Sequence, residues 1–180
     1  MEAFKINRKI AHLIILQRTE LSGKILNRLR KIFGRYLFTN FFSKYFINVN
    51  NIAKKYYQLM NEEYSLLRKY IERKKFFLSI GSGVGGLEVI INNHDTKNFT
   101  LIEKDYVSKK VKYGWDTINC EGYNSIQQLD FFLQSNFLKK ENYKLVNFDK
   151  DSLPISKFDA IISLYSLDYH YDFEIYKDYL

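Results

Sequence analysis

Cysteine and proline are almost absent from this chain of 180 residues, which contains one of each, Cys120 and Pro154. A single cysteine excludes an intramolecular disulfide framework and a zinc site built from cysteines, and it is typical of a reducing compartment. No apolar run approaches the ~20 residues that cross a bilayer, and the run at residues 10–16 lacks the small-residue cleavage site of a signal peptide. The sequence therefore predicts a cytoplasmic protein.

Alanine and arginine are also scarce, with 4 and 7 residues, whereas the chain has 21 lysines, 15 asparagines, 15 tyrosines and 15 phenylalanines. An AT-biased genome favours these abundant residues, so codon supply explains the basic and aromatic character as readily as a binding partner does. Hydrophobic residues (46%) and charged residues (27%) occur at the levels of folded globular proteins, which excludes wholesale disorder. The length suits one domain with an appended segment.

Charge is distributed unevenly along the chain. Residues 1–75 hold 17 Lys/Arg and 5 Asp/Glu, a balance of +12, and residues 76–180 hold 11 Lys and 15 Asp/Glu, a balance of −4. The two balances sum to the net charge of +8. We therefore expect two regions, a basic helical region at residues 1–74 and a second domain at residues 75–180.

The basic region is predicted to be helical. Apolar residues recur at helical spacing over residues 4–33 and 51–73, with Gly23 and Gly34 as interruptions or helix ends. Residues 37–49 are rich in aromatics without a clear period and form an ambiguous connector. Basic amphipathic helices pack on their own domain, lie on an anionic membrane or bind nucleic acid. No nucleic-acid motif accompanies the charge, so packing is favoured, with peripheral attachment to the inner face of the membrane as the alternative.

The second region begins with a pattern that is typical of a ligand-binding turn. The apolar run FFLSI at residues 76–80 predicts a buried strand, GSGVGG follows at 81–86, and LEVII at 87–91 predicts a helix. Glycines let the backbone approach a ligand, and the helix N-terminus offers free N–H groups to an anion. The loop fits both G-x-G-x-x-G and G-x-G-x-G, and it lacks the Gly-Lys-Ser/Thr ending of a nucleoside-triphosphate loop.

A second strand is expected at residues 99–103, and it ends in Glu103-Lys104-Asp105. Glu103 lies 22 residues beyond Gly81, about where an acidic side chain at the tip of the next strand binds ribose hydroxyls. This spacing suits a dinucleotide or another adenosine-bearing ligand. Alternatively, Glu103 and Asp105 are solvated charges at a strand end.

Two more strands are expected near residues 144–148 and 158–164. With them, the chain resembles the class I S-adenosylmethionine-dependent methyltransferases, through the stretches FFLSIGSGVGG, LIEKD, NFDKDSLP and FDAIISLYS in the family's order and approximate spacing. The resemblance covers residues 76–180 and is closest to bacterial sugar or small-molecule methyltransferases. It implies an α/β, Rossmann-like methyltransferase fold at residues 75–180, behind an N-terminal helical extension.

The resemblance also implies which residues bind S-adenosylmethionine. The glycine loop would approach the methionine part, Glu103 would accept hydrogen bonds from the ribose, and Asp149 would reach the adenine amino group. Phe148 or Lys150 would lie beside the adenine ring, and the tip of the fourth strand would line the sulfonium. The full set is Gly81, Ser82, Gly83, Gly85, Glu103, Phe148, Asp149, Lys150, Ser163 and Leu164.

Two features complicate these assignments. The family often carries an acidic residue two positions before the first glycine, where this chain has Ser79. Asp149 and Asp151 are alternatively turn formers before Pro154, and the glycines alternatively serve only a tight structural turn.

Methyl transfer to a hydroxyl needs a base or a metal to take the acceptor's proton. The run at residues 166–171 follows the fourth strand and is expected at the mouth of the pocket. His170 is the first candidate for the general base because its usual pKa is near neutral, and Asp168 is the second. Alternatively, His170 packs at a helix start. No grouping of residues has the spacing of a metal site.

The resemblance implies seven strands in the order 3-2-1-4-5-7-6, of which about four are found, and residues 171–180 have the pattern of the next helix. The chain is therefore expected to be a shortened member, a fragment, or a protein that completes its sheet with another chain. The fourth strand would then be an exposed edge that favours homo-oligomers. The first functional hypothesis is O-directed methyl transfer to a small-molecule or glycan acceptor. The alternatives are a non-catalytic cofactor-binding domain that docks through its basic helices and an NAD-dependent oxidoreductase.

Overall fold

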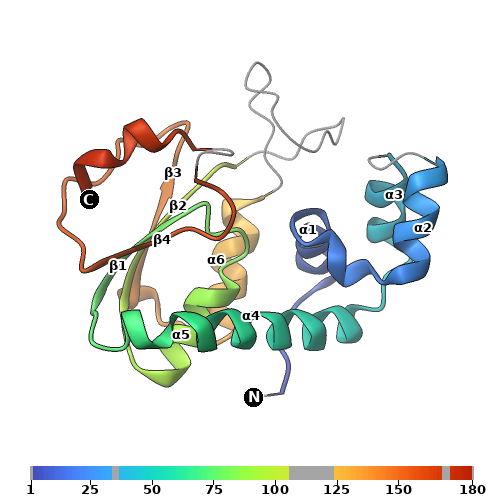
Figure 1. Ribbon diagram of the computed structural model, residues 1–180, viewed down its shortest axis with the longest axis horizontal. Coiled ribbons are helices and arrows are strands. Elements are labelled where there is room, and N and C mark those ends of the chain that lie inside the picture. Colours follow the sequence, from blue (N-terminus) through green and yellow to red (C-terminus); the bar gives the residue numbers. More distant parts are fainter. Residues whose placement is uncertain (1, 34–36, 106–123, 168–170, 180) are drawn as a thin grey trace.

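The computed structural model describes residues 2–33, 37–105, 124–167 and 171–179. It is an α/β structure with a four-stranded parallel sheet in the order β3-β2-β1-β4 (Figure 1). This confirms the predicted α/β class and the parallel sheet of about four strands. The strands are β1 (Phe76–Ile80), β2 (Asn98–Glu103), β3 (Tyr143–Asn147) and β4 (Ala160–Ile162).

The register of the sheet brings four strand ends to one edge. Ile80 of β1 lies opposite Ile102 of β2, and Glu103 lies opposite Asn147 of β3. Because all strands are parallel, the residues that follow β1, β2, β3 and β4 emerge on the same side of the sheet. We call this side the carboxyl edge. Ligands of open α/β sheets bind outside the carboxyl ends of the strands, so a ligand site is expected at this edge.

Helices connect the strands and precede the sheet. The α-helices are α1 (Arg8–Gln17), α2 (Lys24–Phe33), α3 (Leu37–Tyr45), α4 (Val49–Ile71), α5 (Gly86–His94) and α6 (Ile126–Ser135). Short 3-10 helices are η1 (Thr19–Ser22), η2 (Lys140–Asn142), η3 (Phe173–Ile175) and η4 (Lys177–Tyr179). Side-chain oxygens of Asn7, Asn48 and Ser125 accept backbone N–H groups at the starts of α1, α4 and α6, which explains where these helices begin.

Side chains of the strands alternate between two apolar clusters. Phe77 and Leu101 face the larger cluster, which they share with buried residues of α1, α4, α5 and α6. Leu78 and Ile80 face the smaller cluster, which is closed by Tyr171 and other residues of the C-terminal segment. The basic N-terminal helices and the sheet therefore share one hydrophobic core, and the opposite face of the sheet is covered by the last residues of the chain.

Four elements differ from the prediction. The connector expected at residues 37–49 contains a helix, α3, and the helix expected at 171–180 is replaced over the described residues by η3 and η4. β4 is shorter than residues 158–164 because side chains take over its hydrogen bonds at both ends. The carboxylate of Asp159 accepts two backbone N–H groups at the start of β1, and the hydroxyl of Ser163 donates to the carbonyl of Ile80 over 2.9 Å. Helix α6 was not predicted.

Among the residues with described positions, no helix combines the length and the apolar character that crossing a membrane requires.

Candidate functional site

The glycine loop leaves β1 at the carboxyl edge. The N–H of Gly81 donates to the carbonyl of Ile102 over 2.9 Å, so the strand pairing continues one residue into the loop. Gly81 has φ +64°, which an L residue rarely adopts, and a Cβ there would collide with the side chain of Ser166. Gly85 is left-handed at φ +84° and forms the N-cap of α5. The backbone conformation of the loop therefore requires glycine at positions 81 and 85, in addition to any close approach of the loop to a ligand.

Glu103 joins the tip of β2 to the glycine loop. Its Oε2 accepts the N–H of Gly83 over 2.7 Å, and its Oε1 accepts the N–H of Lys104 over 2.9 Å. Glu103 is only 8% exposed, so the alternative of a solvated charge is wrong for this residue. Burial raises the pKa of Glu103 above its usual value, and the hydrogen bonds that the carboxylate accepts oppose that rise.

Tyr171 fills the space beside Glu103. Its hydroxyl donates to Oε1 of Glu103 over 2.7 Å, and its ring meets that of Phe148 edge-on at a centroid distance of 5.1 Å. The Nζ of Lys104 lies 5.7 Å from the centroid of the Tyr171 ring and 5.1 Å from that of Phe148. Burial and the neighbouring carboxylate raise the pKa of Tyr171 well above its usual value, so the phenol remains a hydrogen-bond donor.

The tip of β3 contributes both buried and exposed groups. The N–H of Phe148 donates to the carbonyl of Glu103 over 2.9 Å, which fixes the half-buried ring at the carboxyl edge. Asp149 and Lys150 follow in an exposed turn. The carboxylate of Asp151 accepts the N–H of Asn147 over 2.7 Å, so Asp151 is a turn former, as the alternative held.

The residues that follow β4 lie on the other side of the glycine loop. The hydroxyl of Ser163 donates to Ile80 and accepts the N–H of Leu167 over 3.0 Å, and Leu164 packs half-buried against the core. Tyr165 is 77% exposed and has φ +64°, and the guanidinium of Arg18 lies 4.9 Å from its ring centroid. A left-handed non-glycine residue costs about 1–2 kcal/mol, so the backbone is strained at this point of the edge.

A buried carboxylate lies next to Ser79, the position where the resembled family often has an acid. The hydroxyl of Ser79 donates to Oε1 of Glu88, which comes from the first turn of α5. Burial raises the pKa of Glu88 to about 7. Within the described part of the chain, Oε2 of Glu88 and Oγ of Ser82 are buried without a hydrogen-bond partner. A carboxyl group thus lies beside position 79, and it comes from α5 rather than from β1.

The N-terminal helices form a wall against the glycine loop. Oε1 of Gln17, at the end of α1, lies 2.6 Å from where a Cβ of Gly83 would be, and the hydroxyl of Tyr56 in α4 lies 2.5 Å from where that of Gly86 would be. Arg18 is held by Glu63 of α4 through two hydrogen bonds of 2.8 and 3.1 Å. Helical periodicity placed Tyr56 on an apolar stripe, but no sequence signal relates these residues to the loop.

Both predicted bases, His170 and Asp168, lie outside the described residues, as do Trp115 and Cys120. Over the described ranges, no three His, Cys, Asp or Glu side chains group as a metal site would require.

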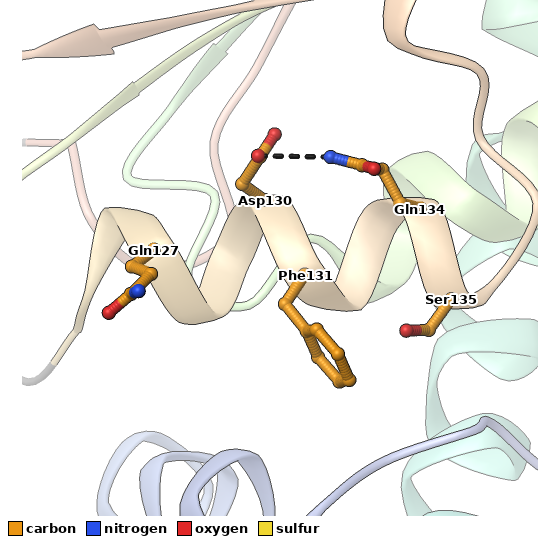
Figure 2. Close-up of a pocket in the computed structure, with 5 residues that line it drawn as sticks. All are labelled: Gln127, Asp130, Phe131, Gln134 and Ser135. Atoms are coloured by element: carbon orange, nitrogen blue, oxygen red, sulfur yellow. Dashed lines mark hydrogen bonds between the residues drawn. The ribbon is translucent and has the colours of Figure 1, made fainter.

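A surface hollow of about 430 Å³ is formed by residues of α6, none of which is a predicted site residue (Figure 2). It is lined by Gln127, Asp130, Phe131, Gln134 and Ser135. The carboxylate of Asp130 already accepts hydrogen bonds from Gln134 (3.0 Å), Lys140 (2.5 Å) and Tyr143 (2.5 Å). These bonds tie α6 to the start of β3, and the hollow offers no free reactive group.

The carboxyl edge therefore brings several predicted cofactor residues together. Glu103 contacts Gly83 of the glycine loop and the backbone of Phe148, and Ser163 contacts Ile80, directly before the loop. Asp149 and Lys150 are exposed in the turn after β3. Comparisons of the sequence with protein-family models and with curated proteins find no match.

Proposed function

We propose that the chain binds S-adenosylmethionine at the carboxyl edge and transfers its methyl group to a small-molecule or glycan acceptor. One observation carries this proposal: the N–H of Gly83 donates to the carboxylate of Glu103, so the glycine loop contacts the acid at the end of β2. In this proposal the parallel sheet is the first part of a Rossmann-like methyltransferase fold. Such folds bind adenosine between these two features.

The residues present fit an adenosine ligand once Tyr171 moves away. A phenol hydroxyl on a carboxylate makes the same kind of hydrogen bond as a sugar hydroxyl, so Tyr171 holds the acceptor that a ribose would use on Glu103. Its ring also lies against Phe148, the residue expected beside the adenine. Ligand binding therefore requires that Tyr171 leave both Glu103 and Phe148.

Two polar atoms at the loop support a ligand with polar and cationic groups. The buried Oγ of Ser82 and Oε2 of Glu88 have no partner among the residues described, and such atoms are uncommon unless a ligand or water satisfies them. Because the pKa of Glu88 is about 7, its carboxyl group is partly ionised at neutral pH, and its ionised form attracts an ammonium or sulfonium. The same ionised form repels the pyrophosphate of a dinucleotide, which usually binds at that helix terminus. This favours S-adenosylmethionine over NAD.

When bound, S-adenosylmethionine supplies an electrophilic methyl group. The chain's own task is alignment, because an in-line displacement gains most of its rate from the relative position of donor and acceptor. His170 and Asp168, which follow β4 along the chain, are proposed to take the proton from the acceptor hydroxyl.

A non-catalytic domain is the second candidate, and a specific observation favours it. Glu103 already accepts hydrogen bonds from Gly83, Lys104 and Tyr171, so the edge is closed and satisfied without a ligand. A domain that no longer catalyses methyl transfer would still keep these hydrogen bonds of Glu103.

Calorimetric titration of the full chain with S-adenosylmethionine and with NAD tests the first premise. We expect binding of S-adenosylmethionine and none of NAD, and binding of NAD alone would overturn the proposal. Transfer of a radiolabelled methyl group to panels of hydroxyl acceptors tests the second premise. Binding without transfer to any acceptor would favour the non-catalytic domain.

A further inference from the structure

Helices α2 and α3 expose an unusual amount of apolar surface. Six large apolar side chains that are each more than half exposed lie between residues 25 and 46. With the exposed cations of the same helices they form what we call the aromatic–basic surface. Its residues are Ile25, Ile32, Phe33, Phe41, Tyr45 and Phe46 together with Lys24, Arg28, Lys31 and Lys44.

The aromatic part of this surface is continuous. Ring contacts run from Phe33 to Phe38 (5.6 Å between centroids), from Phe38 to Phe42 (6.0 Å) and from Phe42 to Phe46 (5.7 Å). Phe41 then contacts both Phe46 (5.7 Å) and Tyr45 (5.4 Å). Phe38 and Phe42 are half-buried, and through them the exposed rings at the end of α2 are joined to those at the end of α3. The exposed aromatics are therefore connected to one another rather than scattered.

Helix α3 buries two hydroxyl side chains and exposes two aromatic ones. Thr39 and Ser43 are fully buried, and the hydroxyl of Ser43 donates to the carbonyl of Thr39 over 2.6 Å and lies 2.8 Å from Nδ1 of His12. Phe42 packs half-buried against the core, whereas Phe41 and Tyr45 of the same helix are exposed. A helix in water usually buries its aromatics and exposes its hydroxyls, so the outer face of α3 matches an apolar environment outside the chain.

The charge of this region has one sign. No acidic residue occurs in the sequence between Glu20 and Glu62, whereas eight Lys or Arg residues do: Lys24, Arg28, Arg30, Lys31, Arg35, Lys44, Lys54 and Lys55. The partner that complements this surface is therefore anionic as well as apolar. The surface also lies at the opposite end of the molecule from the sheet (Figure 1), so it is separate from the site at the carboxyl edge.

We propose that the aromatic–basic surface docks the protein peripherally on an anionic phospholipid bilayer. The rings would enter the boundary between headgroups and acyl chains, and the cations would meet the phosphates. A nucleic acid would use cations and rings too, but the exposed aliphatic side chains of Ile25 and Ile32 suit hydrocarbon and offer nothing to a base or phosphate. The docking is peripheral because no described helix meets the requirements for a membrane span.

Co-sedimentation with sucrose-loaded vesicles tests the charge part of the proposal. The full chain should bind vesicles of equal parts phosphatidylcholine and phosphatidylglycerol and bind pure phosphatidylcholine far less, with binding that weakens as salt is added. A cation near an anionic membrane strengthens binding about fivefold, so Lys24→Gln, Arg28→Gln and Lys31→Gln together should weaken it about 100-fold. The matched control neutralises Lys139, Lys144 and Lys157, three exposed lysines elsewhere, and should change binding little. Equal losses in both triple variants would overturn the proposal.

A second pair of variants tests the apolar part. Ile32→Ser, Phe41→Ser and Phe46→Ser together should weaken vesicle binding at least tenfold. The same number of exposed apolar residues replaced elsewhere, Leu66→Ser, Tyr70→Ser and Ile155→Ser, should not. In case the first variant folds poorly, Phe41→Trp in the otherwise unchanged chain should shift its emission to the blue with anionic vesicles, and Leu66→Trp should not. No shift from Phe41→Trp would contradict docking through this face.

The same variants also test two other partners for the aromatic–basic surface, a nucleic acid and a second copy of this chain. If single-stranded RNA binds more tightly than vesicles at equal salt and the serine variant abolishes that binding, the surface is a nucleic-acid site and the proposal is overturned. If light scattering shows a dimer that the serine variant converts to a monomer, the surface is a contact between copies of this chain, which also overturns it.

Discussion

The hydroxyl of Tyr171 donates to Oε1 of Glu103 over 2.7 Å and holds the C-terminal segment against the tip of β2. Tyr171 is 3% exposed, and it packs with Leu78, Ile80 and Ile102 on the face of the sheet opposite the N-terminal helices. This hydrogen bond links the carboxylate proposed to bind ribose to the segment that follows β4. Ligand binding and the position of the C-terminal segment are therefore expected to be coupled.

Tyr171→Phe should bind S-adenosylmethionine at least tenfold more tightly than the unchanged chain. The variant removes the hydroxyl that competes for Glu103, and a hydrogen bond to a charged group contributes about 1.5–3 kcal/mol. The same loss should lower the free energy of unfolding without ligand by about 1.5–3 kcal/mol. Calorimetry and urea unfolding measure the two effects. Tyr179→Phe, which removes a hydroxyl that donates to the carbonyl of Pro154, is the control and should leave the affinity unchanged. Weaker binding by Tyr171→Phe would mean that the phenol belongs to the ligand site.

Gly83→Ala should destabilise the chain more than Gly23→Ala. Both glycines have positive φ, +62° and +88°, so both variants lose about 1–2 kcal/mol to backbone strain. Only at Gly83 does the new Cβ meet a neighbour, Oε1 of Gln17 at 2.6 Å, whereas Gly23 has open space. The difference between the two free energies of unfolding, measured in urea, reports that contact. Equal losses would show that Gln17 does not constrain the loop.

Glu88→Gln should change how stability depends on pH. Because burial raises the pKa of Glu88 from 4.5 to about 7, the folded state keeps a proton that the unfolded state releases. The contribution of this group is fully present below about pH 4.5 and is lost as the pH rises through about 7, a decline of about 3 kcal/mol. Glu88→Gln lacks this decline, so its stability relative to the unchanged chain should rise between these values.

Urea unfolding at several pH values measures that difference, with Glu62→Gln on the exposed face of α4 as the control. Other buried carboxylates titrate in both chains and cancel in the comparison. Parallel stability curves for Glu88→Gln and the unchanged chain would contradict the account of a buried carboxylate at the loop.

The sheet could be predicted from local sequence because each strand is a short apolar run with clear limits. FFLSI is bounded by charged residues and the first glycine of the loop, and β1 spans these five residues. The placement of Glu103 beside the glycine loop followed from strand order alone, since neighbouring parallel strands end at one edge. The length of β4 was overestimated. Asp159 and Ser163 look like strand residues in the sequence, but hydrogen bonds of their side chains replace the backbone pairing at the two ends of the strand.

The missed features depend on tertiary contacts. Helix α3 shows no ordinary apolar period because it buries Thr39 and Ser43 and exposes Phe41 and Tyr45. Gln17 comes to the site from a helix whose sequence carries no binding motif, and Glu88 comes from the helix of the glycine-loop pattern, where its position has no assigned role. Tyr171 was expected in a helix at the mouth of the pocket, and its contact with Glu103, 68 residues earlier in the chain, has no local signal.

The binding isotherm of S-adenosylmethionine for the unchanged chain and for Glu103→Gln tests the central claim most directly. The carboxylate is the acceptor proposed for the ribose hydroxyls, and charged hydrogen bonds contribute about 1.5–3 kcal/mol, so the variant should bind at least tenfold more weakly. Glu141 is an exposed carboxylate distant from Glu103 in the sequence, so Glu141→Gln should bind S-adenosylmethionine as the unchanged chain does. Equal affinity of Glu103→Gln and the unchanged chain, or no binding by either, would contradict a cofactor site at the carboxyl edge.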